Sequence, residues 1–361
     1  MDKKKIQYTS SDEQIAKLES QHLIIRNKEQ AEKHLKTFGY SNLIKGYREP
    51  YVVTENNKKV YRSGVTFDQI TSLFLLDKNL RSAVFSAMLD LEEHVKACAA
   101  DVIAKSFGTD PHEYLQFKNY RDKRKTKPQF RLASILNKMQ SALQTDKNPI
   151  HHYQESYGSV PPWILFNSMY FTTMVNFIDL LKKQEQEEMA SKLYNTKNIS
   201  LPLDSIRKLM MDTLFICVDY RNISAHGGRI YNHNSTSRLR FNEIFGENTD
   251  FNVEIDGFAR LLFLLRLLNY QNPYLRLDDT LQNELTRHCT RFPEDITYLS
   301  RILNVDIVTF NIVYTSKRSN KFHFNQHCSG IENAKEITIE EALQKGYSPC
   351  KRCCRGMPIN Q

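Results

Sequence analysis

The sequence lacks a long apolar run, and its amino terminus lacks a targeting signal. No segment approaches the ~18 to 20 consecutive apolar residues that a helix needs to cross a bilayer. The opening residues, MDKKKIQYTSSDEQ, contain no apolar signal core. These absences argue against a membrane-spanning or secreted protein. We therefore expect a cytoplasmic protein that has no membrane partner.

An internal repeat, a glycine-rich phosphate loop and a disulfide framework are also missing. Their absence argues against a solenoid, a P-loop nucleotide hydrolase and a small secreted scaffold. Among the seven cysteines, Cys98 and Cys217 lie inside apolar helical patterns, where a reduced thiol behaves as a small core residue. Four others, from Cys328 onward, gather near the carboxyl end, which makes that end the candidate metal site.

The chain carries a surplus of positive charge. Its 361 residues have a formal net charge of +9 and a pI near 9.0. This surplus favours a polyanionic partner, although solubility alone also explains it. A hydrophobic content of 40% indicates a folded protein, long enough for one large helical core or for two or three domains.

Helical periodicity dominates residues 1–305 and predicts a mainly α fold. Besides a helix that ends at Gly227, the predicted helices cover residues 10–23, 28–38, 66–108, 163–181, 251–268 and 280–303. The longest begins with a capping box formed by Thr66 and Gln69. Tyr40, Tyr47 and Tyr51 stand among cations in the turn before it. Packing inside the protein and stacking on RNA bases are both open for them.

The residues with the most distinctive chemistry lie within LFICVDYRNISAHGGRIYN, at residues 214–232. The apolar helix in this string ends at two glycines, and Arg221, Asn222 and His226 precede that end within about one and a half turns. Such a set can cleave RNA without a metal. His226 takes the proton from a ribose 2′-hydroxyl, Arg221 stabilises charge on the attacked phosphate, and Asn222 orients the imidazole or a phosphate.

The spacing of this set poses a geometric problem. On an ideal helix, a five-residue offset separates Arg221 and His226 by about 140° around the axis. Three solutions are open. The long arginine wraps around the helix, the helix is distorted at its end, or a second chain brings another copy of the motif. The alternative to catalysis is a purely structural helix end, with a solvated arginine and a capping histidine.

Residues 120–127, YRDKRKTK, form the strongest basic run and are expected to be a loop. Such a run is often only a solvated surface, but near a ribonuclease site it would attract phosphates. The candidate RNA-binding residues are Arg121, Lys123, Arg124, Lys125, Lys127 and, after the central motif, Arg229.

The central string resembles the HEPN superfamily, and more closely abortive-infection proteins of the AbiD and AbiF type. These proteins carry Arg-Asn-x-x-x-His followed by Arg, an apolar residue, an aromatic and Asn, positions that residues 229–232 fill here. A Gly-Tyr-rich string at residues 39–51 and a Pro-Pro-x-Trp-like entry at residues 161–163 extend the resemblance over roughly the first 270 residues, although Asn42 departs from the pattern. Glu92 and Lys96 also match, which implies a supporting role beyond an ordinary i,i+4 pair.

This resemblance implies a HEPN-like helical bundle over residues 1–305. It also implies a metal-independent endoribonuclease of a bacterial anti-phage abortive-infection or toxin-like system. Related HEPN nucleases work as dimers, and some family members are encoded beside a small noncoding RNA. The expected partners are therefore RNA and a second copy of this chain. The alternative function is a non-catalytic scaffold that holds a small structured noncoding RNA or a protein partner.

Residues 306–361 change in character and predict a separate small α+β unit. Alternating β-branched residues are followed by a helical stretch and a Cys-x-x-Cys pair, in a pattern that resembles the small cysteine-bearing module of Ada-type repair proteins. The predicted ligands of a structural zinc ion are His323 or His327, Cys328, Cys350 and Cys353, with Cys354 as a further candidate. A reversible disulfide and inert thiols remain open.

Overall fold

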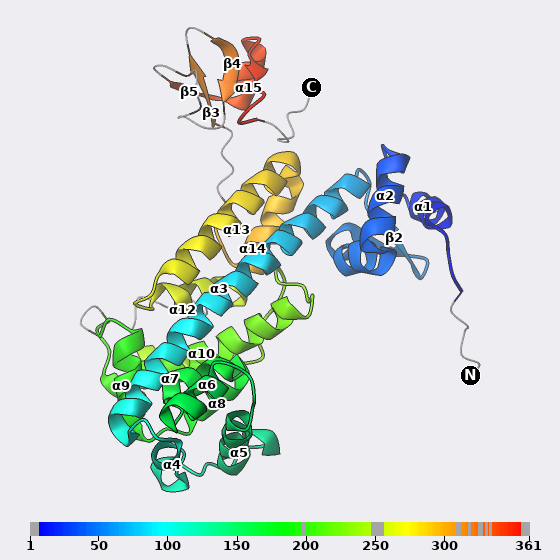
Figure 1. The fold of residues 1–361 in the computed structure, drawn as a ribbon. Coiled ribbons are helices and arrows are strands. Elements are labelled where there is room, and N and C mark those ends of the chain that lie inside the picture. Colours follow the sequence, from blue (N-terminus) through cyan, green and yellow to red (C-terminus); the bar gives the residue numbers. More distant parts are fainter. Residues whose placement is uncertain are drawn as a thin grey trace. The chain divides into compact units, whose positions relative to one another are not determined.

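The computed structural model describes residues 7–196, 199–246, 256–307, 312–316, 319–323, 328, 331 and 334–354. Most of these residues are helical, and a small sheet lies near the carboxyl end (Figure 1). The predicted mainly α class with a small C-terminal α+β unit is therefore confirmed. The chain divides into two compact units, Met1–Leu80 with Thr280–Gln361, and Arg81–Asp279. The boundary predicted after residue 305 falls within the first unit and remains a prediction.

The first unit begins with two capped helices, α1 (Ser11–Ser20) and α2 (Lys28–Phe38). The Ser10 hydroxyl accepts from the Glu13 N–H, and the Glu13 carboxylate accepts from the Ser10 N–H, so both halves of a capping box form. Asn27 caps α2 by accepting from the Gln30 N–H at 2.9 Å. Both helices lie where the sequence places them.

A hairpin that the sequence analysis missed follows α2. After the short helices Ser41–Lys45 and Glu49–Tyr51, strand β1 (Val52–Glu55) pairs antiparallel with β2 (Lys58–Tyr61). The turn residues Asn56 and Asn57 have positive φ angles of 47° and 59°, which suit a tight hairpin turn. Tyr47 donates to Asp77 at 2.5 Å and Tyr51 donates to Asp295 at 2.7 Å, both in the interior. These two tyrosines are therefore packed inside the protein.

The long helix α3 (Phe67–Phe107) begins in the first unit and continues in the second. Thr66 accepts from the Gln69 N–H at 3.1 Å, but the Gln69 amide donates to Asp295 rather than back to the cap. The predicted segment 280–303 is two helices, α13 (Asn272–Arg291) and α14 (Ile296–Leu303). They are separated at Pro293, whose ring nitrogen has no hydrogen to donate.

In the second unit, α10 (Leu203–Ala225) is the central helix and packs against α8, α9, α11 and α12. The helices around it are α4 (Pro111–Tyr114), α5 (Leu132–Leu143), α6 (Ile150–Tyr157), α7 (Pro162–Leu165), α8 (Phe171–Asp179), α9 (Lys183–Leu193), α11 (Phe241–Phe245) and α12 (Gly257–Arg266). Short 3-10 turns cover Phe117–Asn119, Pro128–Phe130 and Phe166–Ser168.

Two further predicted helices differ in extent from the observed ones. The segment 163–181 is not continuous, because α7 ends before the extended residues Met169 and Tyr170. The Ser168 hydroxyl donates to the Leu165 carbonyl at 2.7 Å and so competes with helix continuation. In the segment 251–268, α12 begins at Gly257, and residues 251–255 lie outside the described part of the chain.

The C-terminal sheet has the strand order β5-β3-β4-β6. Strand β3 (Ile312–Ser316) pairs antiparallel with β4 (Ser319–His323) and β5 (Lys335–Thr338), whereas β6 (Ser348–Pro349) is parallel to β4. Helix α15 (Ile339–Gln344) follows β5, and Val313, Phe322, Ile337 and Ala342 form a small core. Across all the described residues, the helices are too short or too polar to span a bilayer.

Candidate functional site

Helix α10 contains Arg221 and Asn222 in its last turns, ends at Ala225 and is followed by a tight turn. The His226 N–H donates to the Asn222 carbonyl at 3.1 Å, but His226 itself has φ −95° and ψ 14°, outside helical geometry. Gly227 then has a φ of 73°, and the Gly228 N–H returns to the Ile223 carbonyl at 2.9 Å. His226 therefore caps the helix, because it keeps the helical hydrogen bond to the residue four positions earlier while its own backbone leaves helical geometry.

The turn at α10 is held from two sides. A Cβ atom at Gly228 would lie 2.2 Å from Cγ1 of Ile223, so this close approach requires glycine. From α3, the Arg81 guanidinium donates to the carbonyls of Gly227 and Gly228 at 3.1 and 3.3 Å. Arg81 thus anchors the turn, a role that the sequence analysis did not assign to it.

Arg221 lies beside a buried ion pair on α3. Lys96 Nζ is 2.7 Å from Glu92 Oε1, and only 8% and 10% of the two side chains is exposed. Arg221 Nε lies 3.7 Å from the other oxygen of Glu92, and its guanidinium carbon is 6.0 Å from the centre of the Phe85 ring. One carboxylate thus faces two cations, which leaves a net positive charge at the arginine. The structure brings together Glu92, Lys96 and Arg221.

The other two residues of the motif face different surroundings. Asn222 Nδ2 is 3.5 Å from the Thr172 hydroxyl on α8, a long hydrogen bond. His226 is exposed, and within the described residues its ring has no hydrogen-bond or ionic partner. The imidazole can therefore contact a substrate without first breaking an internal bond.

The segment after the motif is fixed to α10 by two acidic side chains. Asp219 accepts from the Ser235 hydroxyl at 2.7 Å and from the Thr236 N–H at 3.2 Å, and His233 Nε2 lies 3.2 Å from it. Asp212 binds the Arg240 guanidinium at 2.7 to 3.1 Å. Sequence spacing gave no signal for these contacts, because 14 to 28 residues separate the partners. Within this segment, Arg229 is exposed.

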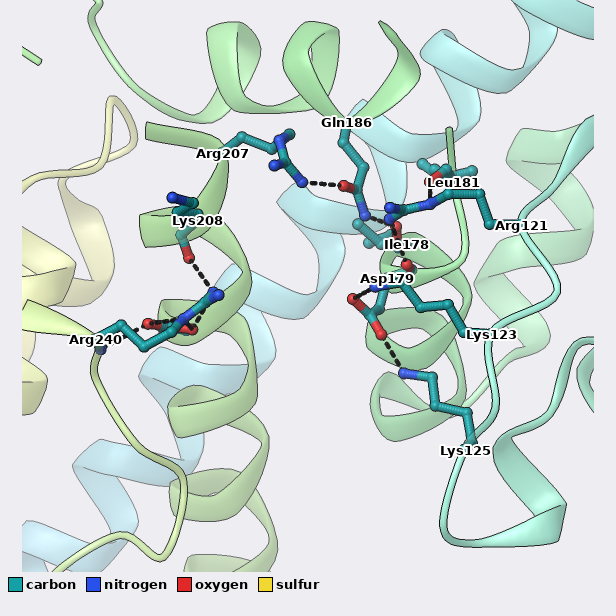
Figure 2. Close-up of polar contacts among 11 residues, drawn as sticks. Arg121, Lys123, Lys125, Ile178, Asp179, Leu181, Gln186, Arg207, Lys208 and Arg240 are labelled. Atoms are coloured by element: carbon teal, nitrogen blue, oxygen red, sulfur yellow. Dashed lines mark hydrogen bonds and ion pairs between the residues drawn. The ribbon is translucent and has the colours of Figure 1, made fainter. Parts of the chain in front are cut away.

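The basic run is a loop, as predicted, and three of its five cations contact the end of α8 (Figure 2). Arg121 donates to the carbonyls of Leu181 and Asp179 at 2.7 and 3.0 Å. Lys123 lies 2.9 Å from the Asp179 carboxylate, and Lys125 pairs with the other oxygen of the same group. Burial raises the pKa of Asp179, but the two lysines outweigh it and hold that pKa below its usual value.

Arg124 and Lys127 remain exposed on this loop, whereas Lys125 is close to α10. Lys125 Nζ lies 5.8 Å from the Phe215 ring centre, and Phe215 precedes Arg221 by about 9 Å along the helix. Figure 2 shows two further cations nearby, Arg207 bound to Gln186 at 3.0 Å and Arg240 bound to the Lys208 carbonyl. Both lie far from the basic run in sequence, so the pattern of that run does not predict them.

The predicted metal ligands of the C-terminal unit come together. One ligand atom from each of His323, Cys328, Cys350 and Cys353 lies within 4.8 Å of every other. His323 ends β4, and Cys350 and Cys353 follow β6 in one turn. Cys354 is not part of this group, because its sulfur lies against the Phe322 carbonyl at 3.5 Å. The alternative ligand His327 lies outside the described residues.

Two of these thiols differ in acidity. Burial and the neighbouring thiols raise the pKa of Cys328 to about 11. Burial also raises the pKa of Cys350, but hydrogen bonds from the backbone N–H groups of Cys353 and Arg352 outweigh this effect and lower it. One nitrogen and three sulfurs at this separation can hold a metal ion.

A family model described as Abi-like protein matches residues 33–232. The chain belongs to this Abi-like family. The matched region contains Glu92, Lys96, Arg221, Asn222 and His226 and ends at the last residue of the central string, whereas the C-terminal sheet lies outside it. No curated protein and no solved structure matches the chain. Membership in the family indicates a role in abortive infection.

Proposed function

We propose that this Abi-like protein is a HEPN-type endoribonuclease that acts in anti-phage abortive infection and cleaves RNA with Arg221, Asn222 and His226. One observation carries the proposal. The exposed imidazole of His226, which has no partner among the described residues, lies at the end of α10, five residues after an arginine that a buried ion pair accompanies. A capping histidine needs no such arginine, whereas phosphodiester cleavage needs both a base and a fixed cation.

The chemistry proceeds by attack of a neighbouring hydroxyl on phosphorus. His226 accepts the proton of the ribose 2′-hydroxyl, the 2′-oxygen bonds to phosphorus, and the bond from phosphorus to the 5′-oxygen breaks. The products are a 2′,3′-cyclic phosphate and a 5′-hydroxyl, which takes up a proton as it leaves. Arg221 stabilises the charge that gathers on the non-bridging oxygens. Asn222 orients either the imidazole or the phosphate.

Glu92 and Lys96 act as positioning residues in this scheme. The Glu92 carboxylate is shared between Lys96 and Arg221, so it restricts the arginine without neutralising the site. Because the pair is buried, it is screened less by salt than a surface pair. Binding of RNA is assigned to the exposed cations Arg124, Lys127 and Arg229, with Arg121, Lys123 and Lys125 shaping the loop.

Two copies of the chain supply the groups that one lacks. In-line cleavage needs a base, an acid for the leaving oxygen and a cation, and two motifs across a two-fold axis provide them. The apolar residues before Arg221, such as Ile216 and Cys217, are buried in their own chain. They are therefore not available to contact a second chain. Leu89 on α3, 38% exposed and one turn after Phe85, is the better candidate.

This assembly makes a specific prediction for mixed chains. Combining Arg221→Ala chains with His226→Ala chains should not restore full activity, because each mixed dimer still lacks one group of each kind. Sedimentation at the assay concentration should show a dimer, and Leu89→Asp should shift it toward monomer and lower activity. An active protein that stays monomeric would refute the dimer while leaving cleavage itself intact.

Cleavage is tested with labelled RNA in the presence of EDTA. Arg221→Ala and His226→Ala should each lower the rate about 100-fold or more, and their melting temperatures should stay close to that of the wild type. Matched controls are Arg276→Ala, which removes an exposed ion pair with Asp90, and His112→Ala at an exposed position on α4. Protein that shifts RNA on a gel without shortening it would favour the scaffold function instead.

For the C-terminal unit, we propose a structural zinc ion held by His323, Cys328, Cys350 and Cys353. The donor set fits, because zinc takes four nitrogen and sulfur ligands in tetrahedral geometry. The sheet has a core of only a few side chains, so a metal would contribute directly to its folding. Elemental analysis of the purified protein should find about one zinc per chain, a stoichiometry set by one four-ligand site. Absence of zinc would reject the assignment.

A further inference from the structure

The first unit contains a cavity of about 270 Å³ lined by α2, α3 and α13. It belongs to a different unit from Arg221 and His226, and the proposed cleavage makes no use of it. The side chains that matter for its chemistry are His34, Asp68, Thr71, Glu284, Arg287 and Arg291.

Two buried polar atoms in the cavity wall lack partners. Thr71 is only 4% exposed, and its hydroxyl makes no hydrogen bond to any described residue. The same holds for Nδ1 of His34. Buried polar atoms are almost always paired, so two orphans in one wall indicate that something else satisfies them. Burial lowers the pKa of His34, so near pH 7 its ring is neutral and offers one donor and one acceptor.

The charges of the cavity are arranged by depth. The Glu284 and Asp68 side chains are 10% and 30% exposed, whereas their partners Arg287 and Arg291 are 54% and 42% exposed. The Glu284 carboxylate is therefore the most buried of these four charged groups, Asp68 is partly exposed, and the two guanidinium groups are the most exposed. Asp68 is 3.5 Å from Arg291, which leaves both able to bind a ligand. This polarity favours a ligand that has hydrogen-bond donors at its inner end and an anion at its outer end.

Ser72 and His288, which both line the cavity, belong to a row of hydrogen-bonded side chains. Ser72 Oγ lies 2.9 Å from His288 Nδ1, and His288 Nε2 lies 2.9 Å from Asp295, which also accepts from Tyr51 and Gln69. The connectivity is that of a nucleophile, a base and an acid. However, Ser72 lies within α3, where the backbone N–H groups are used by the helix and cannot stabilise an oxyanion. We therefore interpret this row as a preformed wall.

We propose that the cavity binds a nucleoside monophosphate, with the base inside and the phosphate on Arg287 and Arg291. The planar edge of a base presents several donors and acceptors to Asp68, Glu284, Thr71 and His34, which a single ammonium group cannot satisfy together. The volume is just below the range of ~300 to 1,000 Å³ that drug-sized ligands occupy, which suits a base and ribose with the phosphate at the mouth. Arginine is well suited to that phosphate, because its planar guanidinium binds two oxygens at once.

Calorimetric titration of the full chain tests this site. The probes are AMP, GMP, CMP and UMP in EDTA, with adenosine, ribose 5-phosphate and glutamate as partial or competing ligands. At least one mononucleotide should bind, and it should bind at least about tenfold more tightly than the nucleoside or the sugar phosphate, a factor typical of one lost group of contacts. No binding by any of the four, or tighter binding of glutamate, would overturn the proposal.

Two variants locate the binding. Thr71→Val removes the orphan hydroxyl at nearly constant shape, so it should leave the melting temperature unchanged or raised while weakening nucleotide binding about tenfold. Arg291→Ala should weaken binding of the nucleotide but not of the nucleoside. Arg301→Ala, at an exposed position on α14 in the same unit, is the matched control and should have no effect. If neither Thr71→Val nor Arg291→Ala changes the affinity for the nucleotide, the nucleotide binds elsewhere and this site is refuted.

Discussion

Replacing Glu92 by glutamine tests the link between the buried ion pair and Arg221, the arginine that we propose to be catalytic. Glu92 Oε1 is 2.7 Å from Lys96, and Oε2 is 3.7 Å from Arg221. At an effective dielectric constant of about 20, a contact of 3.7 Å amounts to about 4 kcal/mol of gross attraction before desolvation. Because Glu92→Gln leaves Lys96 buried without its counter-charge, we expect a net loss of about 3 kcal/mol in the free energy of unfolding.

A second substitution separates stability from positioning. Lys96→Met added to Glu92→Gln removes the stranded charge, so most of the lost stability should return. Activity should not return, because Arg221 still lacks its carboxylate. We expect RNA cleavage to fall about tenfold in both variants, a typical cost of losing a positioning contact.

Thermal denaturation and single-turnover cleavage measure the two effects. A loss of 3 kcal/mol in a domain of this size corresponds to a fall of roughly 6 to 12 °C in melting temperature. Assays at 20 °C keep each variant folded, so the two readouts stay independent. Recovery of both stability and cleavage in the double variant would show that Glu92 acts only on folding. If Glu92→Gln changes neither stability nor cleavage, Glu92 neither stabilises the fold nor positions Arg221.

Three further predictions follow from the described contacts. Gly228→Ala should lower the melting temperature, since its Cβ would clash with Ile223, and Ile223→Ala should restore part of the loss, as measured by calorimetry. Asp179 has a lowered folded pKa, so its stabilisation is present above the unfolded value of about 4 and is lost as pH falls through the folded value. The melting temperature should therefore fall more between pH 5 and pH 3 in the wild type than in Asp179→Asn. Strong zinc chelation should remove the circular dichroism signal of the C-terminal sheet but leave the helical body intact.

Helix positions could be predicted from the sequence where local signals agreed. The predicted segment 28–38 matches α2, and the predicted segment 10–23 covers α1 but extends three residues beyond its end at Ser20. The helix after Pro162 was overextended, because a hydroxyl bond from Ser168 stops it and periodicity does not report such a contact. The β1–β2 hairpin was missed although its Asn56–Asn57 turn is a recognisable signal.

In the candidate sites too, residues close together in sequence could be predicted, whereas contacts between distant residues could not. Arg221, Asn222 and His226 could be proposed from the sequence because they lie close together in it, and the cluster of His323, Cys328, Cys350 and Cys353 could be proposed because cysteine spacing is informative. The hydrogen bond from Arg81 to the Gly227 carbonyl could not be predicted from the sequence, since 146 residues separate the two. The pairing of Lys123 and Lys125 with Asp179 was equally hidden, so a charge run that looked free in sequence is partly neutralised in the fold.

The most direct test of the central claim uses an RNA oligonucleotide with one preferred cleavage position. The same strand is made with a single 2′-deoxy nucleotide on the 5′ side of that bond, and both are incubated with the wild-type protein in EDTA. If the 2′-hydroxyl is the nucleophile and His226 removes its proton, the first strand yields a 2′,3′-cyclic phosphate and the second is not cut at that bond. Equal cleavage of both strands would contradict the account.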